Sequence, residues 1–371
     1  MTDKTKKKMG VHTPHGQTVL VLQGGGALGA YQAGVYQAMH ESGIEPDWVI
    51  GTSIGAINGA IIAANRPEHR LQRLHDFWDQ IEHQAPTFGP LAWLGLGSMM
   101  ENMSTIMQGV PTFFKPNPSA MLGIMTKLGV DQASYYTTEP LRETLSSILD
   151  FDYLSQGDTR LTVGAVHVQG GDMRYFDSRD ELLNVEHVMA SGALPPAFPA
   201  VRINGEPYWD GGIYSNTPIE AVLDDSPRRD STIFAVNVWQ QYGPEPESIW
   251  DVMGRQKEIQ FASKTESHID RQKQIHRLRH VIRELKQYIP KSKLEEARVK
   301  ELTSWGCGTT MHVLRLLAPR VASEDQNKDI DFSATGIHAR WAAGYADTVA
   351  MIKRAPWEGP VDSIEGVVVH G

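Results

Sequence analysis

The sequence predicts an α/β fold, in which strands and helices alternate along the chain. Two short apolar runs, residues 18–22 and 47–50, each end at a glycine turn and lead into a segment with helical spacing. The chain has 371 residues, 41% hydrophobic and 21% charged, which suffices for one large domain or two modest ones with a real core. These observations are typical of a sheet with helices on its faces, and they exclude a disordered or fibrous protein.

The expected elements follow the apolar pattern in chain order. Short apolar runs predict strands, and they cover residues 18–22, 47–50, 161–168, 233–238 and 311–317. Helical spacing or composition predicts helices, and they cover residues 27–42, about 54–65, 249–300 and 338–353. Gly43 and Pro67 end the first two helices, because glycine suits a helix C-terminus and the residue before a proline disfavours helix. Residues 1–16 are expected to form a flexible tail.

Composition excludes several classes of protein. There are 35 Lys and Arg against 44 Asp and Glu, so the net charge is −9, which argues against a dedicated nucleic-acid binder. The single cysteine, Cys307, excludes an internal disulfide framework and a cysteine-based zinc site, and it fits a reducing compartment. The most apolar windows are far shorter than the ~20 residues of a membrane span, and no signal peptide is recognised. We expect a cytoplasmic protein that is soluble or lies on a membrane surface.

The first glycine motif, residues 24–29 (GGGALG), lies between the first strand and the first helix. It matches the dinucleotide-binding pattern G-x-G-x-x-G, and Glu45 or Asp47 lies near the distance expected for a ribose-binding acid. Glycines let backbone N–H groups approach a ligand closely, and a helix N-terminus stabilises negative charge. The same donors would serve the oxyanion of an acyl transfer, so the motif alone leaves both interpretations open.

The second glycine motif, residues 51–55 (GTSIG), matches G-x-S-x-G and lies between an apolar strand and a helix of small residues. Gly51 and Gly55 suit a sharp turn that keeps the hydroxyl of Ser53 exposed. The Ile54 N–H would then point at a developing oxyanion. The alternative is a tight turn whose serine only caps the helix. The strand–turn–helix setting favours a nucleophile.

A serine nucleophile requires a general base. Late histidines stand outside any glycine-rich loop that would present them to a site, and they are His276, His280, His312, His338 and His370. We expect His276 and His280, spaced i, i+4 in a basic helical segment, to be surface residues or an incidental pair. The better candidate is Asp210, because the two glycines that follow it would let its carboxylate project into a pocket. A simple turn is the alternative for this Asp-Gly-Gly segment.

Taken together, four motifs in order resemble the patatin-like phospholipase family, whose members are serine acyl hydrolases with a Ser–Asp dyad. The motifs are GGGALG at 24–29, GTSIG at 51–55, ASGALPPAFP at 190–199, and DGG at 210–212 with Asn216 and Pro218 behind it. The resemblance covers roughly residues 17–240. It implies a three-layer α/β/α fold with a mainly parallel sheet.

The resemblance also implies roles for individual residues. Ser53 would be the nucleophile and Asp210 its base, with no metal or cofactor. The oxyanion hole would be formed by backbone N–H groups, those of Gly24, Gly25, Gly26 and Ile54. The motifs would be supported by further glycines, which are Gly29, Gly51, Gly55, Gly211 and Gly212. An aspartate with an ordinary pKa near ~3.9 is a weak base at pH 7, so we expect a partly desolvated site that raises the pKa of Asp210.

The region after the motifs, residues 241–371, is similar to a C-terminal region of some bacterial family members. We expect a helical extension packed on a catalytic domain of residues 17–240. Residues 255–300 carry 13 Lys and Arg against 6 Asp and Glu, a net charge of +7. This charge belongs either to a solvated helical hairpin or to a basic face for an anionic lipid.

Residues 84–130 interrupt the α/β rhythm with five prolines and six of the 14 methionines. The segment also holds the aromatic residues Phe88, Trp93, Phe113 and Phe114. Long insertions are often lids, and methionine adapts to varied apolar ligands. We expect a mobile cover over Ser53 that contacts lipid, with completion of the core as the alternative.

The expected function is hydrolysis of carboxylic ester bonds in lipids through an acyl-enzyme, with a lipid or other acyl ester as partner and peripheral contact with a membrane. Many family members carry Arg or Lys where this chain has Leu28, which weakens the inference that a phospholipid is the substrate. The alternatives are a nucleotide-dependent oxidoreductase and a non-catalytic lipid-binding member of the same fold.

Overall fold

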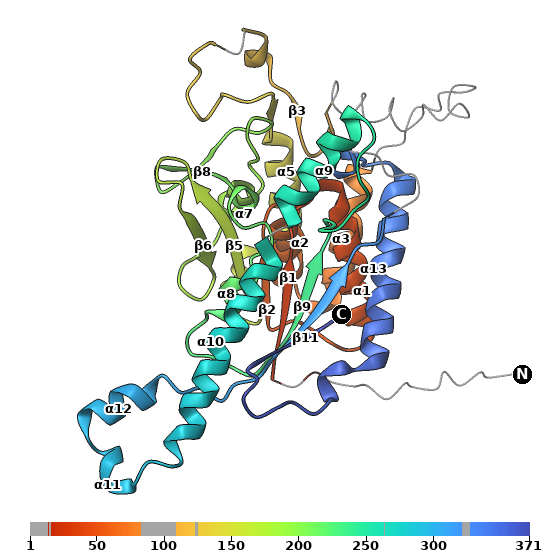
Figure 1. Ribbon diagram of the computed structural model, residues 1–371. Helices are drawn as coiled ribbons and strands as arrows, with labels where there is room; N and C mark the ends of the chain where they lie inside the picture. Colours follow the sequence, from red (N-terminus) through yellow and green to blue (C-terminus); the bar gives the residue numbers. More distant parts are fainter. Residues whose placement is uncertain (1–13, 15, 83–108, 123–124, 263, 321–326) are drawn as a thin grey trace, which may run out of the picture.

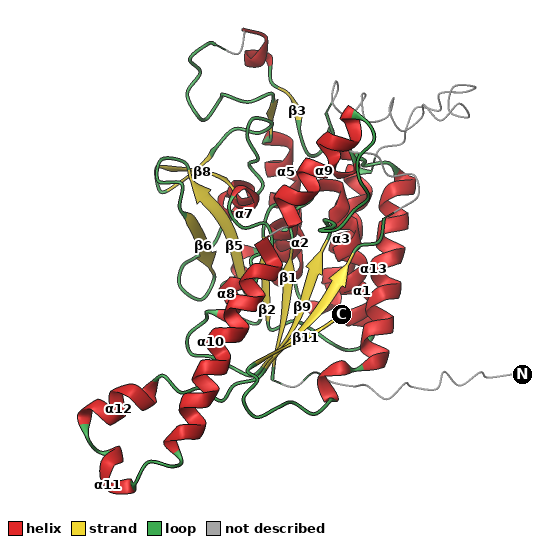
Figure 2. Cartoon of the chain, viewed as in Figure 1, coloured by secondary structure: helices red, strands yellow, loops and turns green. Residues whose placement is uncertain are grey.

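The computed structural model describes residues 14, 16–82, 109–122, 125–262, 264–320 and 327–371. Its centre is a nine-stranded sheet with helices on both faces (Figures 1 and 2). The sheet consists of β1 (Gln17–Leu22), β2 (Trp48–Gly51), β5 (Arg160–His167), β6 (Met173–Asp177), β7 (Val201–Ile203), β8 (Glu206–Asp210), β9 (Ser231–Asn237), β10 (Met311–Leu317) and β11 (Val367–His370). Nearly all of the predicted tail lies outside the described residues.

The strand order is β11-β10-β9-β1-β2-β5-β8-β7, and β6 pairs with β5. From β11 to β5 every neighbouring pair is parallel, whereas β6 and β8 are antiparallel to β5 and β7 is antiparallel to β8. The long parallel strands are almost continuously apolar, because both of their faces are buried. Their carboxyl ends therefore meet at one edge of the sheet, where ligands bind in open α/β folds.

Helices cover both faces and make three layers. They are α1 (Ala30–Glu41), α2 (Ile54–Ala63), α3 (Pro67–Ile81), α5 (Glu139–Ile148), α6 (Phe151–Leu154), α7 (Val185–Ser191), α8 (Glu220–Leu223), α9 (Ile249–Ala262), α10 (Lys264–Lys286), α11 (Lys291–Leu294), α12 (Ala297–Ser304) and α13 (Ala334–Arg354). Leu20 and Leu22 of β1 belong to the hydrophobic core beneath α1, α2 and α13. Val19 and Val21 point to the other core, beneath α8 and α10.

The C-terminal region is helical, as predicted, and it also completes the sheet. The predicted strand at 311–317 is β10, which pairs with β9, and β11 pairs in turn with β10. Helix α13 lies along α1 (Figure 1). Gly34 and Gly344 permit this close crossing, since a Cβ on either would lie about 2 Å from a backbone oxygen of the opposite helix. No helix among the described residues is long and apolar enough to cross a membrane.

Parts of the predicted cover, residues 84–108 and 123–124, lie outside the described residues, and Phe88 and Trp93 are among them. The described remainder includes β3 (Lys115–Pro116), which pairs with β4 (Tyr136–Thr137), and the short 3₁₀ helix η3 (Pro118–Leu122). Phe113 and Phe114 are 8% and 5% exposed and pack into the main hydrophobic core.

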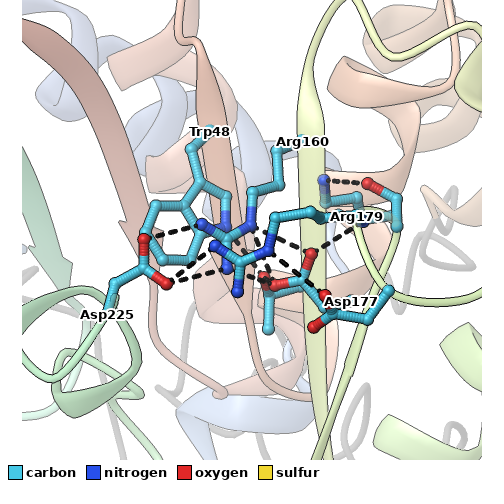
Figure 3. A network of polar contacts seen from close by, with 9 residues as sticks. Trp48, Arg160, Asp177, Arg179 and Asp225 are labelled. Carbon is cyan, nitrogen blue, oxygen red and sulfur yellow. Dashed lines mark hydrogen bonds and ion pairs between the residues drawn. The ribbon is translucent and has the colours of Figure 1, made fainter. Parts of the chain in front are cut away.

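A polar network joins strands near the amino ends of β2 and β5, away from the carboxyl ends where ligands bind (Figure 3). The Arg160 guanidinium binds Asp177 at 2.7 Å and Asp225 at 3.0 Å, and its carbon lies 3.5 Å from the centre of the Trp48 ring. Burial alone would raise the pKa of Asp225, but hydrogen bonds from Arg160 and Arg179 outweigh it and lower that pKa. Because each buried charge has a partner, the network can hold β2, β5 and β6 together without an unpaired charge.

Candidate active site

Ser53 lies in the turn between β2 and α2, at the carboxyl edge of the sheet. Its φ of 57° is a conformation that residues other than glycine rarely adopt. The flanking glycines make this turn sterically possible. A Cβ on Gly51 would lie 2.2 Å from the Gly55 carbonyl oxygen, and one on Gly55 would lie 2.3 Å from the Leu22 carbonyl oxygen. The turn is therefore sharp and strained, the geometry that a nucleophile elbow requires.

Strand β5 brings Asp210 to this turn. Gly51, at the end of β2, pairs with Val163, and Asp210, at the end of β8, pairs with Ala165 two residues further along β5. The Asp210 backbone N–H donates to the Ala193 carbonyl at 3.0 Å. Two strand ends that are 159 residues apart in the sequence thus meet beside one strand.

The Asp210 carboxylate accepts the Gly212 N–H at 2.7 Å, and hydrogen bonding from the Ser53 side chain also acts to lower its pKa. Asp210 is 1% exposed. This burial raises the pKa of Asp210 to about 7, against the lowering effect of the two hydrogen bonds. The expected rise in pKa is therefore present, and its cause is desolvation. A carboxylate with such a pKa can accept a proton near neutral pH.

Ser191, at the end of α7, holds the backbone of Ser53. The Ser53 N–H donates to the Ser191 hydroxyl at 3.0 Å and to its carbonyl at 3.1 Å. The Ser191 hydroxyl in turn donates to the Gly164 carbonyl of β5 at 2.6 Å. Segment 190–199, one of the four motifs, therefore positions the turn that carries Ser53.

The glycine loop after β1 lies beside Ser53, and the structure divides its amides into two groups. Gly24 differs from the prediction, because its N–H donates to the Asn216 carbonyl at 3.1 Å and is not available to a ligand. The N–H groups of Gly25, Gly26 and Ile54 have no acceptor among the described residues. Gly26 has a φ of 55° and packs against the Asp329 carbonyl, which explains the requirement for glycine.

Buried amides and indoles fix the shape of this loop. The Gly24 carbonyl accepts hydrogen bonds from the Trp239 indole at 2.8 Å and the Asn216 side chain at 3.0 Å. Behind the loop, the Gln32 side chain donates to the Gln23 carbonyl at 2.6 Å, and Asn58 donates to Gln32 at 2.9 Å. The network is fully buried, so it holds the free amides in one arrangement.

A cavity of about 440 Å³ opens over Ser53 and Asp210, within the size range of small-molecule sites. Most of its lining is apolar, including Ile57, Leu141, Met189, Phe113, Phe114, Phe198 and Phe332. The aromatic side chains pack on one another, with the Phe114 and Phe198 rings 5.3 Å apart. Charged side chains among the described lining residues are limited to Asp210, Lys257 and Asp329.

Histidines take no part in the described lining of the cavity. The surface location expected for His276 and His280 is wrong: they are 0% and 3% exposed. Both lie on the buried face of α10, where His276 contacts the Leu223 carbonyl at 3.2 Å and His280 contacts the Thr309 carbonyl at 2.9 Å. Helical spacing placed the pair on one face, but β11 and α8, which cover that face, are remote in sequence.

The two acids that would bind a ribose in the dinucleotide interpretation, Glu45 and Asp47, have other partners. Glu45 binds Arg70 at 2.8 Å and accepts a hydrogen bond from Tyr36 at 2.9 Å. Asp47 precedes β2, and it accepts the Thr18 N–H at the edge of the sheet away from the glycine loop. Neither acid is thus placed to bind a ribose beside residues 24–29. Across the described residues, no three His, Cys, Asp or Glu side chains form a group that could hold a metal ion.

Several site residues were missed by sequence reasoning. Gln23, Trp239, Lys257 and Phe261 contact the glycine loop or line the cavity, but they belong to no motif. Their common signal is weak: Gln23 is a polar residue directly before the glycines, and Trp239 follows an apolar strand. Lys257 lies in a helix whose charge pattern resembles that of a solvent-exposed helix.

Two family models match this chain. A model described as patatin-like phospholipase matches residues 20–223, and one described as patatin phospholipase matches residues 259–363. Because the first covers more than half of the chain, the chain belongs to the patatin-like phospholipase family. This confirms the family predicted from the four motifs, together with its α/β/α fold.

Similar proteins carry related names. Lysophospholipase NTE1 from Candida glabrata is 27% identical over 252 residues, which are 65% of this chain and 12% of that protein. Patatin-like phospholipase domain-containing protein 6 from Homo sapiens is 44% identical over 64 residues, 17% of this chain and 5% of that protein. The chain thus spans a small part of these relatives' length. The structure of VipD from Legionella pneumophila has 15% identity and a TM-score of 0.38 over 92% of this chain and 67% of that one, too distant to support an argument.

Proposed function

We propose that this protein is a serine hydrolase that cleaves carboxylic ester bonds of lipids. The observation that carries the proposal is that Ser53, in a glycine-flanked turn, and the buried Asp210 line the same apolar cavity, where the Ser53 side chain acts on the pKa of Asp210. The names of the family and of its lysophospholipase relatives support a lipid ester as substrate. Such a substrate also implies peripheral contact with a lipid surface, which forms part of the proposal.

The reaction would proceed through an acyl-enzyme. Asp210 accepts the Ser53 proton while Oγ attacks the ester carbonyl, and the oxyanion is stabilised by the N–H groups of Gly25, Gly26 and Ile54. The carbon–oxygen bond to the alcohol breaks, and Asp210 returns its proton to the leaving alcohol. Water then attacks the acyl-serine, Asp210 takes a proton from it, and Ser53 is restored as the acid departs.

The cavity lining supports an acyl chain as the part bound most deeply. The aromatic side chains of Phe113, Phe114 and Phe198 form an apolar wall. An acyl chain packed against this wall would lose its contact with water, and each buried methylene contributes about 0.8 kcal/mol.

Gly24 supports the loop through its carbonyl and its lack of a side chain, and Gly29, Gly211 and Gly212 support the two turns.

A fluorophosphonate probe tests the proposal directly. We expect it to label wild-type protein at Ser53, and Ser53→Ala to lose both the label and turnover of a short soluble ester. Asp210→Asn should lose nearly all turnover, and the double variant should be little worse than either single variant, since the two residues act as one unit. Retention of wild-type turnover by Asp210→Asn would contradict the dyad.

The same measurements separate the alternatives. A folded wild-type protein that neither reacts with the probe nor hydrolyses esters would be a non-catalytic lipid-binding member of the family. A rise in melting temperature with a nicotinamide cofactor, in the absence of probe labelling, would favour the oxidoreductase.

A further inference from the structure

An ion pair lies in the wall of the catalytic cavity. Lys257, on α9, and Asp329, in the 3₁₀ helix η5 (Lys328–Ile330), both line the cavity, and Lys257 Nζ lies 2.9 and 3.0 Å from the two carboxylate oxygens of Asp329. Their side chains are 39% and 20% exposed. Among the described lining residues, Lys257 is the single cation, and it comes from the C-terminal region.

The backbone around this pair is held by neighbouring residues. Glu258, next to Lys257, is 8% exposed and binds Lys328, next to Asp329, at 2.8 Å. Glu258 also binds Arg255 and Arg320, each at 3.0 Å. α9 and η5 are therefore already joined by a buried charge network, and the Lys257–Asp329 contact is not needed to connect them.

The pair shares its cavity with Ser53 and Asp210. The backbone carbonyl of Asp329 packs directly on Gly26, one of the loop residues with a free N–H. A substrate that extends along this cavity from Ser53 can therefore meet the pair. Leu28, where a cation would stand in many family members, is 2% exposed and offers no charge.

We propose that Lys257 and Asp329 form a charge-selective subsite for the alcohol part of the substrate, fitted to a zwitterionic head group. Lys257 would bind the anionic group, such as a phosphate, and Asp329 the cationic group, such as an ammonium. Insertion of a zwitterion replaces one ion pair with two, so no charge in the cavity is left unpaired. A purely anionic head group would instead be repelled by Asp329. This inference rests on the proposed hydrolase function.

The geometry of the neighbours fits the cationic end of such a head group. Trp239 and Phe261 also line the cavity, and their ring centres are 5.2 Å apart. Aromatic faces attract ammonium groups, including alkylated ones. Lysine carries its charge on a flexible four-carbon stem, so Lys257 can leave Asp329 for a ligand without a backbone change.

The test compares three substrates with the same acyl chain: a zwitterionic lysophosphatidylcholine, an anionic lysophosphatidic acid and a neutral monoacylglycerol. For Lys257→Gln, we expect the ratio of kcat/KM for the zwitterion over the neutral ester to fall about tenfold, the effect of one charge-assisted hydrogen bond. For Asp329→Asn, we expect the ratio of the anion over the zwitterion to rise by a similar factor. Lys257→Arg should largely restore the first ratio.

Matched controls distinguish charge selection from a structural role. Lys293→Gln removes an exposed lysine of α11 that forms an ion pair with Glu296 at 2.7 Å, and it should change none of the ratios. The subsite is refuted if Lys257→Gln and Asp329→Asn both hydrolyse all three substrates in wild-type proportions. It is also refuted if both variants lose activity equally on all three substrates and have a lower melting temperature. Failure of the proposed function would look different, because wild-type protein would then hydrolyse none of the substrates and would not react with the fluorophosphonate.

Discussion

Asp210 shows how one residue acquires a property that its type does not have. An exposed aspartate would be ionised and weakly basic at neutral pH, with a pKa near 3.8. Here the end of β8 places the side chain where water hardly reaches it, and desolvation raises its pKa to about 7. The hydrogen bonds from Ser53 and Gly212 oppose this rise but do not cancel it. The basicity of the Asp210 carboxylate is thus set by its surroundings.

The pH dependence of turnover should report this pKa. With Asp210 as base, kcat/KM on a short soluble ester should fall about tenfold per pH unit below pH 7 and level off above it. Burial should also act on stability. Between pH 3.8 and about 7 the folded state binds more protons than the unfolded one, so this group's contribution to stability falls as pH rises. The melting temperature of Asp210→Asn minus that of the wild type should therefore be larger at pH 8 than at pH 5. A turnover profile with its midpoint near pH 4 would contradict the assignment.

At the scale of elements, the segment before β3 serves the core and the cavity together. Phe113 contacts Phe77 of α3 and also lines the cavity, and Phe114 packs on Tyr136 of β4. The two interpretations of residues 84–130, cover and core, are therefore not exclusive for these two side chains. The cover over Ser53 remains a proposal for the rest of that segment, of which residues 84–108 and 123–124 lie outside the described residues.

Removing the Phe114 side chain tests this double role. We expect Phe114→Ala to destabilise the fold by about 3 kcal/mol, the cost of a large-to-small change in a core. Because the side chain also lines the cavity, the preference for long-chain over short-chain esters should change. Phe176→Ala is the matched control: this side chain is fully buried beside Tyr208 and does not line the cavity, so stability should fall without a change in chain-length preference. Equal preferences in the two variants would assign Phe114 to the core alone.

At the scale of the molecule, the C-terminal region is part of the fold that holds the active site. Its strands β10 and β11 continue the sheet beyond β9, and α13 covers the same face as α1. The glycine loop leads directly into α1, so the contact of α1 with α13 bears on the position of the loop. The crossing of the two helices depends on Gly34, which faces the Trp341 carbonyl, and on Gly344, which faces the Tyr31 carbonyl.

Alanine at these two positions should therefore have an unusual effect. In an ordinary helix, Gly→Ala stabilises by up to about 1 kcal/mol. Here the added Cβ would lie 1.9 Å from a carbonyl oxygen at position 34 and 2.0 Å at position 344, so both variants should lower the melting temperature and the turnover. Gly359→Ala, where the Cβ meets no atom closer than 3.4 Å, should change stability by less than about 0.5 kcal/mol. An unchanged or higher melting temperature for Gly34→Ala would show that the helices adjust freely.

Local pattern was enough to predict the turns of the active site. The glycines around Ser53 and after Asp210 report backbone geometry, which depends on neighbours in the chain, and short apolar runs located β1, β2, β9 and β10. The two glycines after Asp210 made it the candidate base for Ser53, and the resemblance to a family supported that pairing. Long-range packing set the remaining features: the place of β10 and β11 in the sheet, the burial of His276 and His280, the use of the Gly24 N–H by Asn216, and the presence of Lys257 in the cavity. These depend on segments distant in sequence, which periodicity cannot relate, and the raised pKa of Asp210 belongs with them because desolvation exists only once those segments have packed.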